Sequence, residues 1–262
     1  MGMKIRNIAW AGILAMTLLS LLPRTSNGYT SLLKKNLVPA AEFGNILINR
    51  TSEKNGVKPA AFSHWSHRQR HTCRVCHFEL EFNMLVNTTE ITEKANKAGR
   101  YCGTSGCHDN KAAFGHEEPH CGKCHNGNRA SGTEKFSSLS NLPKAKFGNN
   151  IDWVKALDKN KISPVAFRTI KSPDVAILKP FLLAAEWNSI PPAVFLHKAH
   201  TDWLDCNNCH PDIFDIKKHN AKTYTMVGMI TRREFCGVCH MTVAFPMNDC
   251  QRCHERDRKK DK

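Results

Sequence analysis

All twelve cysteines of the 262-residue chain fall into six short clusters, and a histidine follows the last cysteine of every cluster. Five clusters have the form Cys-x-x-Cys-His, whereas one has four intervening residues instead of two. The clusters are CRVCH (Cys73, Cys76, His77), CGTSGCH (Cys102, Cys107, His108), CGKCH (Cys121, Cys124, His125), CNNCH (Cys206, Cys209, His210), CGVCH (Cys236, Cys239, His240) and CQRCH (Cys250, Cys253, His254). No cysteine of the sequence is left over.

Cys-x-x-Cys-His is the attachment pattern of c-type haem. The two thiols add to the vinyl groups of the porphyrin, and the adjacent histidine is the proximal ligand of the iron. Structural zinc and disulfide frameworks also use paired cysteines, but neither requires a histidine after every pair. The sequence therefore predicts six covalently bound haems c, including one on the wider cluster, and the cluster histidines as proximal ligands.

The polypeptide is short of core material for its length. It has only three tyrosines and 23% charged residues, and its mean hydropathy is −0.44. Six porphyrins would supply large flat apolar surfaces that a chain of this composition lacks. We therefore expect a mainly α and coil fold that is scaffolded by haem. Short helices should carry the clusters, with turns between them and little regular secondary structure.

Four further histidines recur in a duplicated frame, FSHWSH at 62–67 and FLHKAH at 195–200. In both copies the second histidine lies six residues before the first cysteine of the next cluster. Histidines three residues apart share one face of a helical turn and can reach two irons. An electron-transfer haem commonly has two axial ligands. We therefore interpret four histidines as distal iron ligands: His64, His67, His197 and His200.

Each frame opens a unit of three clusters, which indicates a tandem array of two trihaem units. The first unit is predicted at about 40–127 and the second at about 192–255. Between them, residues 128–191 read as a linker with short helices around 151–157 and 175–187. Residues 256–262 form a basic tail.

The unit resembles the trihaem cytochrome c7 type, related to cytochrome c3, and especially the tandem trihaem chains described as molecular wires in metal-respiring bacteria. The resemblance covers residues 43–127 and 192–254. It rests on the two histidine frames, the six clusters, Val243-Ala244-Phe245 after CGVCH, and Ala113-Phe114 after CGTSGCH. It implies a ligand map of four pairs: His64 with His77, His67 with His108, His197 with His210, and His200 with His240.

In this family the third haem of a unit takes its distal ligand from between the first two clusters, as histidine or, in some tandem members, methionine. We expect Met84 to pair with His125, and Met226 or Met229 to pair with His254. His219 is the rival in the second unit, and His116 and His120 lie beyond the second cluster of the first. Methionine ligation raises the reduction potential, so two haems would lie above the four bis-histidine haems.

The N-terminus has the pattern of an export signal. Lys4 and Arg6 precede an apolar run, Ile8 to Leu22, that is short for a membrane span. Small residues at Ser26 and Gly28 fit cleavage before Tyr29. Residues 1–28 are therefore predicted as a signal peptide, with an uncleaved anchor as the alternative. This places the protein in the periplasm or at the cell exterior, or attached to the inner membrane through that segment.

These features predict an electron carrier, not an enzyme: a conduit in anaerobic or metal-reducing respiration, in which haem supplies the redox chemistry. Two alternatives remain at this point. One is a multihaem reductase with one open-coordination haem, and the other is a haem subunit of a membrane quinol-oxidising or porin–cytochrome complex.

The charge of the chain indicates which partners it can bind. The net charge of +15 falls to +12 without residues 1–28, and to roughly +6 once six haems carry their propionates. Acidic redox proteins or other multihaem cytochromes are the expected partners. Nucleic acid is not, because the basic tail is short and interrupted by acidic residues.

Overall fold

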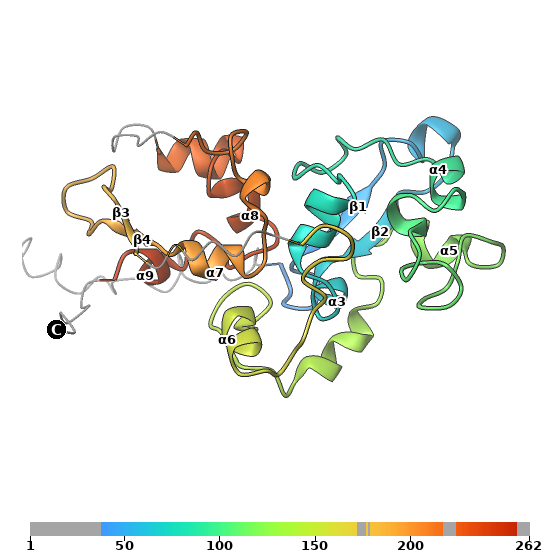
Figure 1. Ribbon diagram of the computed structural model, residues 1–262, viewed down its shortest axis with the longest axis horizontal. Coiled ribbons are helices and arrows are strands. Elements are labelled where there is room, and N and C mark those ends of the chain that lie inside the picture. The colour runs from blue at the N-terminus through green and yellow to red at the C-terminus, as the bar shows by residue number, and fades with distance from the viewer. Residues whose placement is uncertain (1–37, 172–176, 178, 217–223, 256–262) are drawn as a thin grey trace, which may run out of the picture. The chain divides into compact units, whose positions relative to one another are not determined.

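The structure is a computed structural model that describes residues 38–171, 177, 179–216 and 224–255 (Figure 1). The predicted signal peptide or anchor, His219 and the basic tail lie outside the described residues. Among the residues that are described, no helix has the length and apolar character needed to cross a membrane.

Regular elements in the described chain are short. The strands are β1 (Asn45–Ile48), β2 (Ala60–Ser63), β3 (Phe181–Leu183) and β4 (Ala193–Phe195). The α-helices are α3 (His64–Arg68), α4 (Glu93–Lys97), α5 (Cys121–Cys124), α6 (Trp153–Asp158), α7 (His197–Thr201), α8 (Gly237–His240) and α9 (Cys250–Cys253). The 3₁₀ turns are Glu53–Asn55, Tyr101–Gly103, Thr133–Leu139 and Cys206–Asn208, and the π-helical turns are Val75–Glu79 and Gly228–Arg232. The predicted fold class, short helices and coil with little regular structure, is confirmed.

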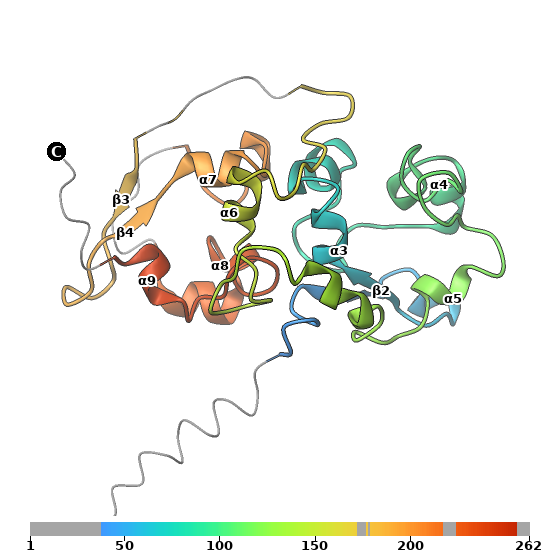
Figure 2. The same cartoon turned by 90° about the horizontal axis from the view of Figure 1, so that it is seen from below.

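Two small antiparallel hairpins support the two histidine frames. In the first, β1 pairs with β2 and Ile46 lies opposite Phe62; in the second, β3 pairs with β4 and Phe181 lies opposite Phe195. β2 runs directly into α3, and β4 leads into α7 (Figures 1 and 2). A two-stranded sheet is only marginally stable by itself. The groups that pack against each hairpin must therefore hold the strand–helix junction in place.

One of the two helices predicted in the linker is confirmed and the other is wrong. The helix expected around 151–157 is α6, and its N-cap Asp152 accepts a hydrogen bond from the Lys155 amide at 3.1 Å. The helix expected around 175–187 is absent from the described part of that range, where β3 forms instead. Pro180, directly before β3, disfavours helical geometry in the residue that precedes it. The apolar run that follows pairs with β4.

The segment predicted as a linker supplies most of the hydrophobic core found among the described residues. Its buried members are Leu139, Leu142, Ile151, Trp153 and Ala156, which pack with Trp65 and Trp203. Trp65 belongs to α3 and Trp203 follows α7. The segment is therefore a packed part of the protein and contacts residues of both units.

A buried ion cluster also connects the two units. The Arg74 side chain donates to Asp205 at 3.0 Å and forms an ion pair with Glu79. The Arg74 amide donates to the Trp203 carbonyl at 2.9 Å. Burial alone would raise the pKa of Glu79, but hydrogen bonds from the Arg168 and Thr169 amides lower it. The Glu79 carboxyl thus stays ionised although its side chain is enclosed.

Candidate functional site

The described chain encloses a cavity of about 3170 Å³. An ordinary small-molecule pocket measures roughly 300–1,000 Å³. The lining includes cysteines or histidines from all six clusters, together with both tryptophans that flank the core, Trp65 and Trp203. Because apolar side chains accompany the clusters, the hollow is suited to several large apolar groups and not to one small ligand.

All twelve cysteines lie among the described residues, and none of them forms a disulfide bond. Burial raises the pKa of Cys76, Cys102 and Cys239 to about 12 and that of Cys236 to about 11. These thiols are therefore uncharged at neutral pH. Among the described residues no three His, Cys, Asp or Glu side chains converge as a structural zinc site requires. The donor set fits pairwise covalent attachment of haem.

The six cluster histidines share one hydrogen-bonding arrangement. In each, Nδ1 lies 2.6–3.0 Å from a backbone carbonyl. A carbonyl can only accept, so Nδ1 must carry the proton and Nε2 presents its lone pair. This second contact is what fixes a metal-ligating imidazole in proteins. The acceptors are the carbonyls of Phe82, Phe114, Lys58, Phe214, Phe245 and Pro191, for His77, His108, His125, His210, His240 and His254 respectively.

Two of these acceptors show a repeated feature that the sequence interpretation missed. His125 donates to Lys58 and His254 to Pro191, and each acceptor lies just before the strand that leads into a histidine frame. The sequence signal is a Pro-Ala-x-Phe motif, PAAF at 59–62 and PAVF at 192–195. The strand that positions the distal histidines thus also orients the third cluster histidine of its own unit.

The distal candidates are held from the same junctions. His67 donates from Nδ1 to Ser63 and His200 to Leu196, both at 2.8 Å. Phe62 stacks on His67 with ring centroids 4.4 Å apart, and Phe195 stacks on His200 at 4.3 Å.

The first histidine of each frame is held differently in the two units. His64 donates to the Gly44 carbonyl at 2.7 Å, whereas Nδ1 of His197 is buried without a hydrogen-bond partner in the described chain. The two frames therefore hold their second histidine alike and their first histidine differently.

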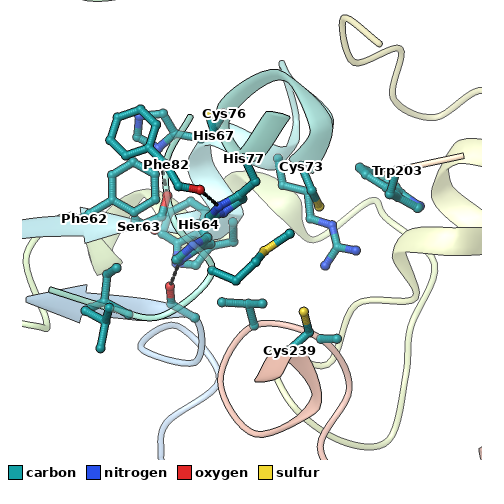
Figure 3. Close-up of a pocket in the computed structure, with 18 of the residues that line it drawn as sticks. Phe62, Ser63, His64, His67, Cys73, Cys76, His77, Phe82, Trp203 and Cys239 are labelled. Carbon is teal, nitrogen blue, oxygen red and sulfur yellow. Dashed lines mark hydrogen bonds between the residues drawn. The ribbon is translucent and has the colours of Figure 1, made fainter. Parts of the chain in front are cut away.

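The structure brings together each of the four histidine pairs of the ligand map. The ring centroids are 6.2 Å apart for His67 and His108, and 6.3 Å apart for His200 and His240. Figure 3 shows His64 and His77 in the same pocket, and burial, with a smaller effect of the nearby His77 imidazole, lowers the pKa of His64 to about 3. Burial lowers the pKa of His197 as well, with smaller effects of the nearby imidazoles of His200 and His210. The neutral imidazoles that an iron requires are therefore favoured.

The methionines are less symmetrical than the histidines. Met84, Met226 and Met229 all line the cavity. The Met229 carbonyl lies against Gly237 of the second cluster of its unit, and the corresponding glycine of the first unit, Gly103, lies against the Asn96 carbonyl. The first unit therefore has asparagine where the second has Met229, and Met84 comes from a different part of the chain.

Two other histidines of the first unit lie near its second and third clusters. The His116 ring is 6.3 Å from that of His108, but its Nε2 is buried among protein atoms and has no partner in the described chain. His120 packs its ring against Phe114. Neither presents a hydrogen-bonded Nδ1 together with an open Nε2, as the cluster histidines do.

The model of the family described as cytochrome c7 and related cytochrome c matches residues 60–126 and 193–255. No curated protein matches. Among solved structures, the C-terminal hexaheme fragment of GSU1996 is 26% identical, covers 80% of this chain and 96% of its own, and has a TM-score of 0.27. The dodecaheme cytochrome c GSU1996 is 21% identical, covers 81% and 74%, and has a TM-score of 0.26.

Proposed function

The chain belongs to the family of cytochrome c7 and related cytochromes c, as a tandem multihaem member, and from this premise we propose that it binds six haems and conducts electrons along them outside the cytoplasm. Multihaem proteins of this type are electron carriers. The haem count, the conduit role and the compartment are the parts that we propose.

The observation that carries the proposal is the continuity of the attachment sites. Cysteines of all six clusters line the same cavity. Four buried cysteines, Cys76, Cys102, Cys236 and Cys239, have a pKa raised mainly by burial and further by a nearby cysteine of another cluster. The neighbouring pairs are Cys124 and Cys102, Cys102 or Cys107 and Cys76, Cys73 and Cys239, Cys239 and Cys209, and Cys236 and Cys253. Every cluster thus has another cluster beside it. One of the neighbouring pairs, Cys73 and Cys239, joins the first unit to the second.

The paired histidines favour electron transfer over substrate chemistry. When bound, haem supplies a one-electron couple, and two axial ligands leave no position for a substrate. Four sites would each have two imidazoles, and seven of these eight donate hydrogen bonds from Nδ1 to backbone carbonyls. We extend the same role to Met84 for His125 and to Met226 or Met229 for His254. This arrangement changes little on oxidation or reduction.

A redox titration of the exported protein, followed by its absorption spectrum, tests the proposal. We expect low-spin spectra for all haems, no binding of carbon monoxide by the reduced protein, and two groups of potentials, with the methionine-ligated haems higher. A high-spin fraction that binds carbon monoxide would contradict the conduit and support a reductase. Met84→Ala should convert one haem to the high-spin state, whereas Met241→Ala, at a methionine with no proposed ligand role, should convert none.

The compartment and the partners form a further part of the proposal. Export through residues 1–28 would deliver the chain to where haem attachment occurs, and the remaining positive charge would attract acidic redox proteins or other multihaem cytochromes. N-terminal sequencing of the mature protein should begin near Tyr29. A retained apolar segment would instead indicate an inner-membrane anchor and favour a subunit of a membrane complex.

A further inference from the structure

Arg68, the last residue of α3, lies between two tryptophans at the point where the two units meet. Its guanidinium carbon is 4.5 Å from the centroid of Trp203 and 5.2 Å from that of Trp153. An arginine stacked in this way keeps the direction of its N–H groups fixed. The side chain is therefore positioned before any ligand binds.

Arg68 has no counter-charge in the part of the chain that the structure describes. None of the ion pairs or hydrogen bonds there includes its side chain, and its Nε is buried without an acceptor. The indole nitrogen of Trp203 is likewise buried with no acceptor. An enclosed positive charge is costly unless an anion accompanies it. Since the guanidinium stays protonated, an acceptor from outside the described residues is required.

The surroundings of Arg68 indicate the chemical class of that acceptor. Arg68 lines the large cavity close to the thiols of Cys73 and Cys239. Figure 3 shows Cys73 and Cys239 on two different segments around the same pocket, which Trp203 also lines. Once both cysteines form thioethers they carry no charge. The anions that attached porphyrins would bring into the cavity are their carboxylates, and a guanidinium can bind a carboxylate through two parallel N–H bonds.

We propose that Arg68 is a carboxylate site at the junction of the units, which binds a propionate of the haem attached at Cys73 and Cys76 or of the haem attached at Cys236 and Cys239. This inference rests on the proposed function. The positive charge opposes the more positive, oxidised state of the iron and so raises the reduction potential of the haem that it contacts. Arg68 would therefore set the potential at the step where electrons pass between units.

The test compares Arg68→Gln with Arg70→Gln in the complete holoprotein. Arg70→Gln removes the same positive charge two residues away, at a side chain that is exposed. Haem-resolved redox titration by NMR assigns each potential to its attachment site. We expect Arg68→Gln to lower the equilibrium constant for reduction of one junction haem about tenfold, which is about 59 mV for a one-electron couple. Arg70→Gln should change none of the six by more than about twofold, because its charge is screened by solvent.

A second readout separates carboxylate binding from simple packing. A propionate held by arginine stays ionised, so the potential of its haem should not vary between pH 5 and pH 8 in the unaltered protein. In Arg68→Gln the pKa of the carboxyl should rise, so that the potential becomes pH-dependent over this range. Loss of packing alone would not produce this dependence.

A shift confined to the haem on Cys73 and Cys76 supports the proposal and assigns the propionate to the first unit, whereas a shift confined to the haem on Cys236 and Cys239 assigns it to the second. If Arg68→Gln retains six low-spin haems and none shifts more than in Arg70→Gln, the proposal is overturned.

A third variant covers the case in which Arg68→Gln does not fold. Arg68→Lys keeps the charge but loses the planar fork, and the equilibrium constant for reduction of its junction haem should fall by less than tenfold. Potentials identical to those of the unaltered protein at both junction haems would overturn the proposal. Fewer than six haems in the unaltered protein would instead contradict the proposed function itself.

Discussion

At the scale of single residues, the site depends on which nitrogen of each imidazole carries the proton. Backbone carbonyls fix the proton on Nδ1 in all six cluster histidines and in three of the four frame histidines. The carbonyls belong to the main chain, so no side-chain substitution removes them. This arrangement keeps Nε2 available for iron wherever the local fold is retained.

Replacing a distal histidine should open one coordination position and no more. We expect His67→Ala to leave six haems attached, to convert one to the high-spin state and to let that haem bind carbon monoxide when reduced. His71→Ala is the matched control, since His71 lies outside the predicted ligand pairs, and all haems should remain low-spin. If His67→Ala stays fully low-spin, the pairing with His108 is wrong.

Acid should weaken the fold through the same side chains. Burial lowers the pKa of His64 to about 3 and those of His67 and His240 to about 4, below the value of about 6.5 expected in the unfolded chain. The unfolded state therefore binds more protons between these values, and the free energy of unfolding falls as the pH drops from about 6.5 towards 4. Denaturant titrations at several pH values measure this, and a constant stability across the window would contradict it.

Cysteines and cluster histidines could be predicted because covalent attachment requires neighbours in sequence. The hydrogen-bond acceptors Lys58 and Pro191 could not be assigned in the same way. They lie 67 and 63 residues from the histidines that they orient, and a carbonyl leaves no mark in the identity of its residue. Only the repeated Pro-Ala-x-Phe motif pointed to those segments.

At the scale of elements, the two units share a strand–helix junction and a glycine contact. A Cβ on Gly237 would lie 2.0 Å from the Met229 carbonyl, and one on Gly103 would lie 1.8 Å from the Asn96 carbonyl. In each unit the second cluster thus packs directly on the segment before it, through a residue that has no side chain. Gly122, at the same position of the third cluster, has no neighbour within 4 Å.

These glycines give a matched pair of substitutions. Gly237→Ala should lower the free energy of unfolding by roughly 1–3 kcal/mol, because backbone must move to accommodate the methyl group. Gly122→Ala, at an open position in α5, should be neutral or stabilising by up to about 1 kcal/mol, since alanine favours a helix over glycine. Chemical denaturation of the two holoproteins compares them, and equal effects would show that the close contact at Gly237 does not constrain the fold.

The elements between the units were the least predictable. The apolar residues of 175–187 are compatible with a helix or a strand. Part of this range forms a strand because it pairs with β4, and that partner could not be identified before the fold was known. Likewise, nothing local in 128–158 shows that its apolar side chains pack with tryptophans from both units. Tertiary contacts determined both outcomes.

At the scale of the whole molecule, two features hold the described chain together around its cavity: the small core between the units and the ion cluster of Arg74, Glu79 and Asp205. The side chains of Arg74, Glu79 and Asp205 are 4%, 2% and 7% exposed. Removing one member leaves enclosed charges without their partner, which is more damaging than loss of an exposed pair.

Arg74→Met should therefore lower the free energy of unfolding by about 3–5 kcal/mol. Lys198→Met, which removes the exposed pair with Asp202 at 2.8 Å, should cost no more than about 1 kcal/mol. Thermal unfolding of the two holoproteins distinguishes them. A similar loss in both variants would mean that the buried cluster does not hold the units together.

Haem attachment is the claim on which the rest depends, because the chain encloses a cavity of about 3170 Å³ and buries few apolar residues of its own. The intact mass of the exported protein, measured under denaturing conditions, tests it most directly, since thioether-linked haem remains with the chain. We predict the polypeptide mass plus six haems, falling to five in a Cys102→Ser, Cys107→Ser double variant. A mass equal to that of the bare polypeptide would contradict the account.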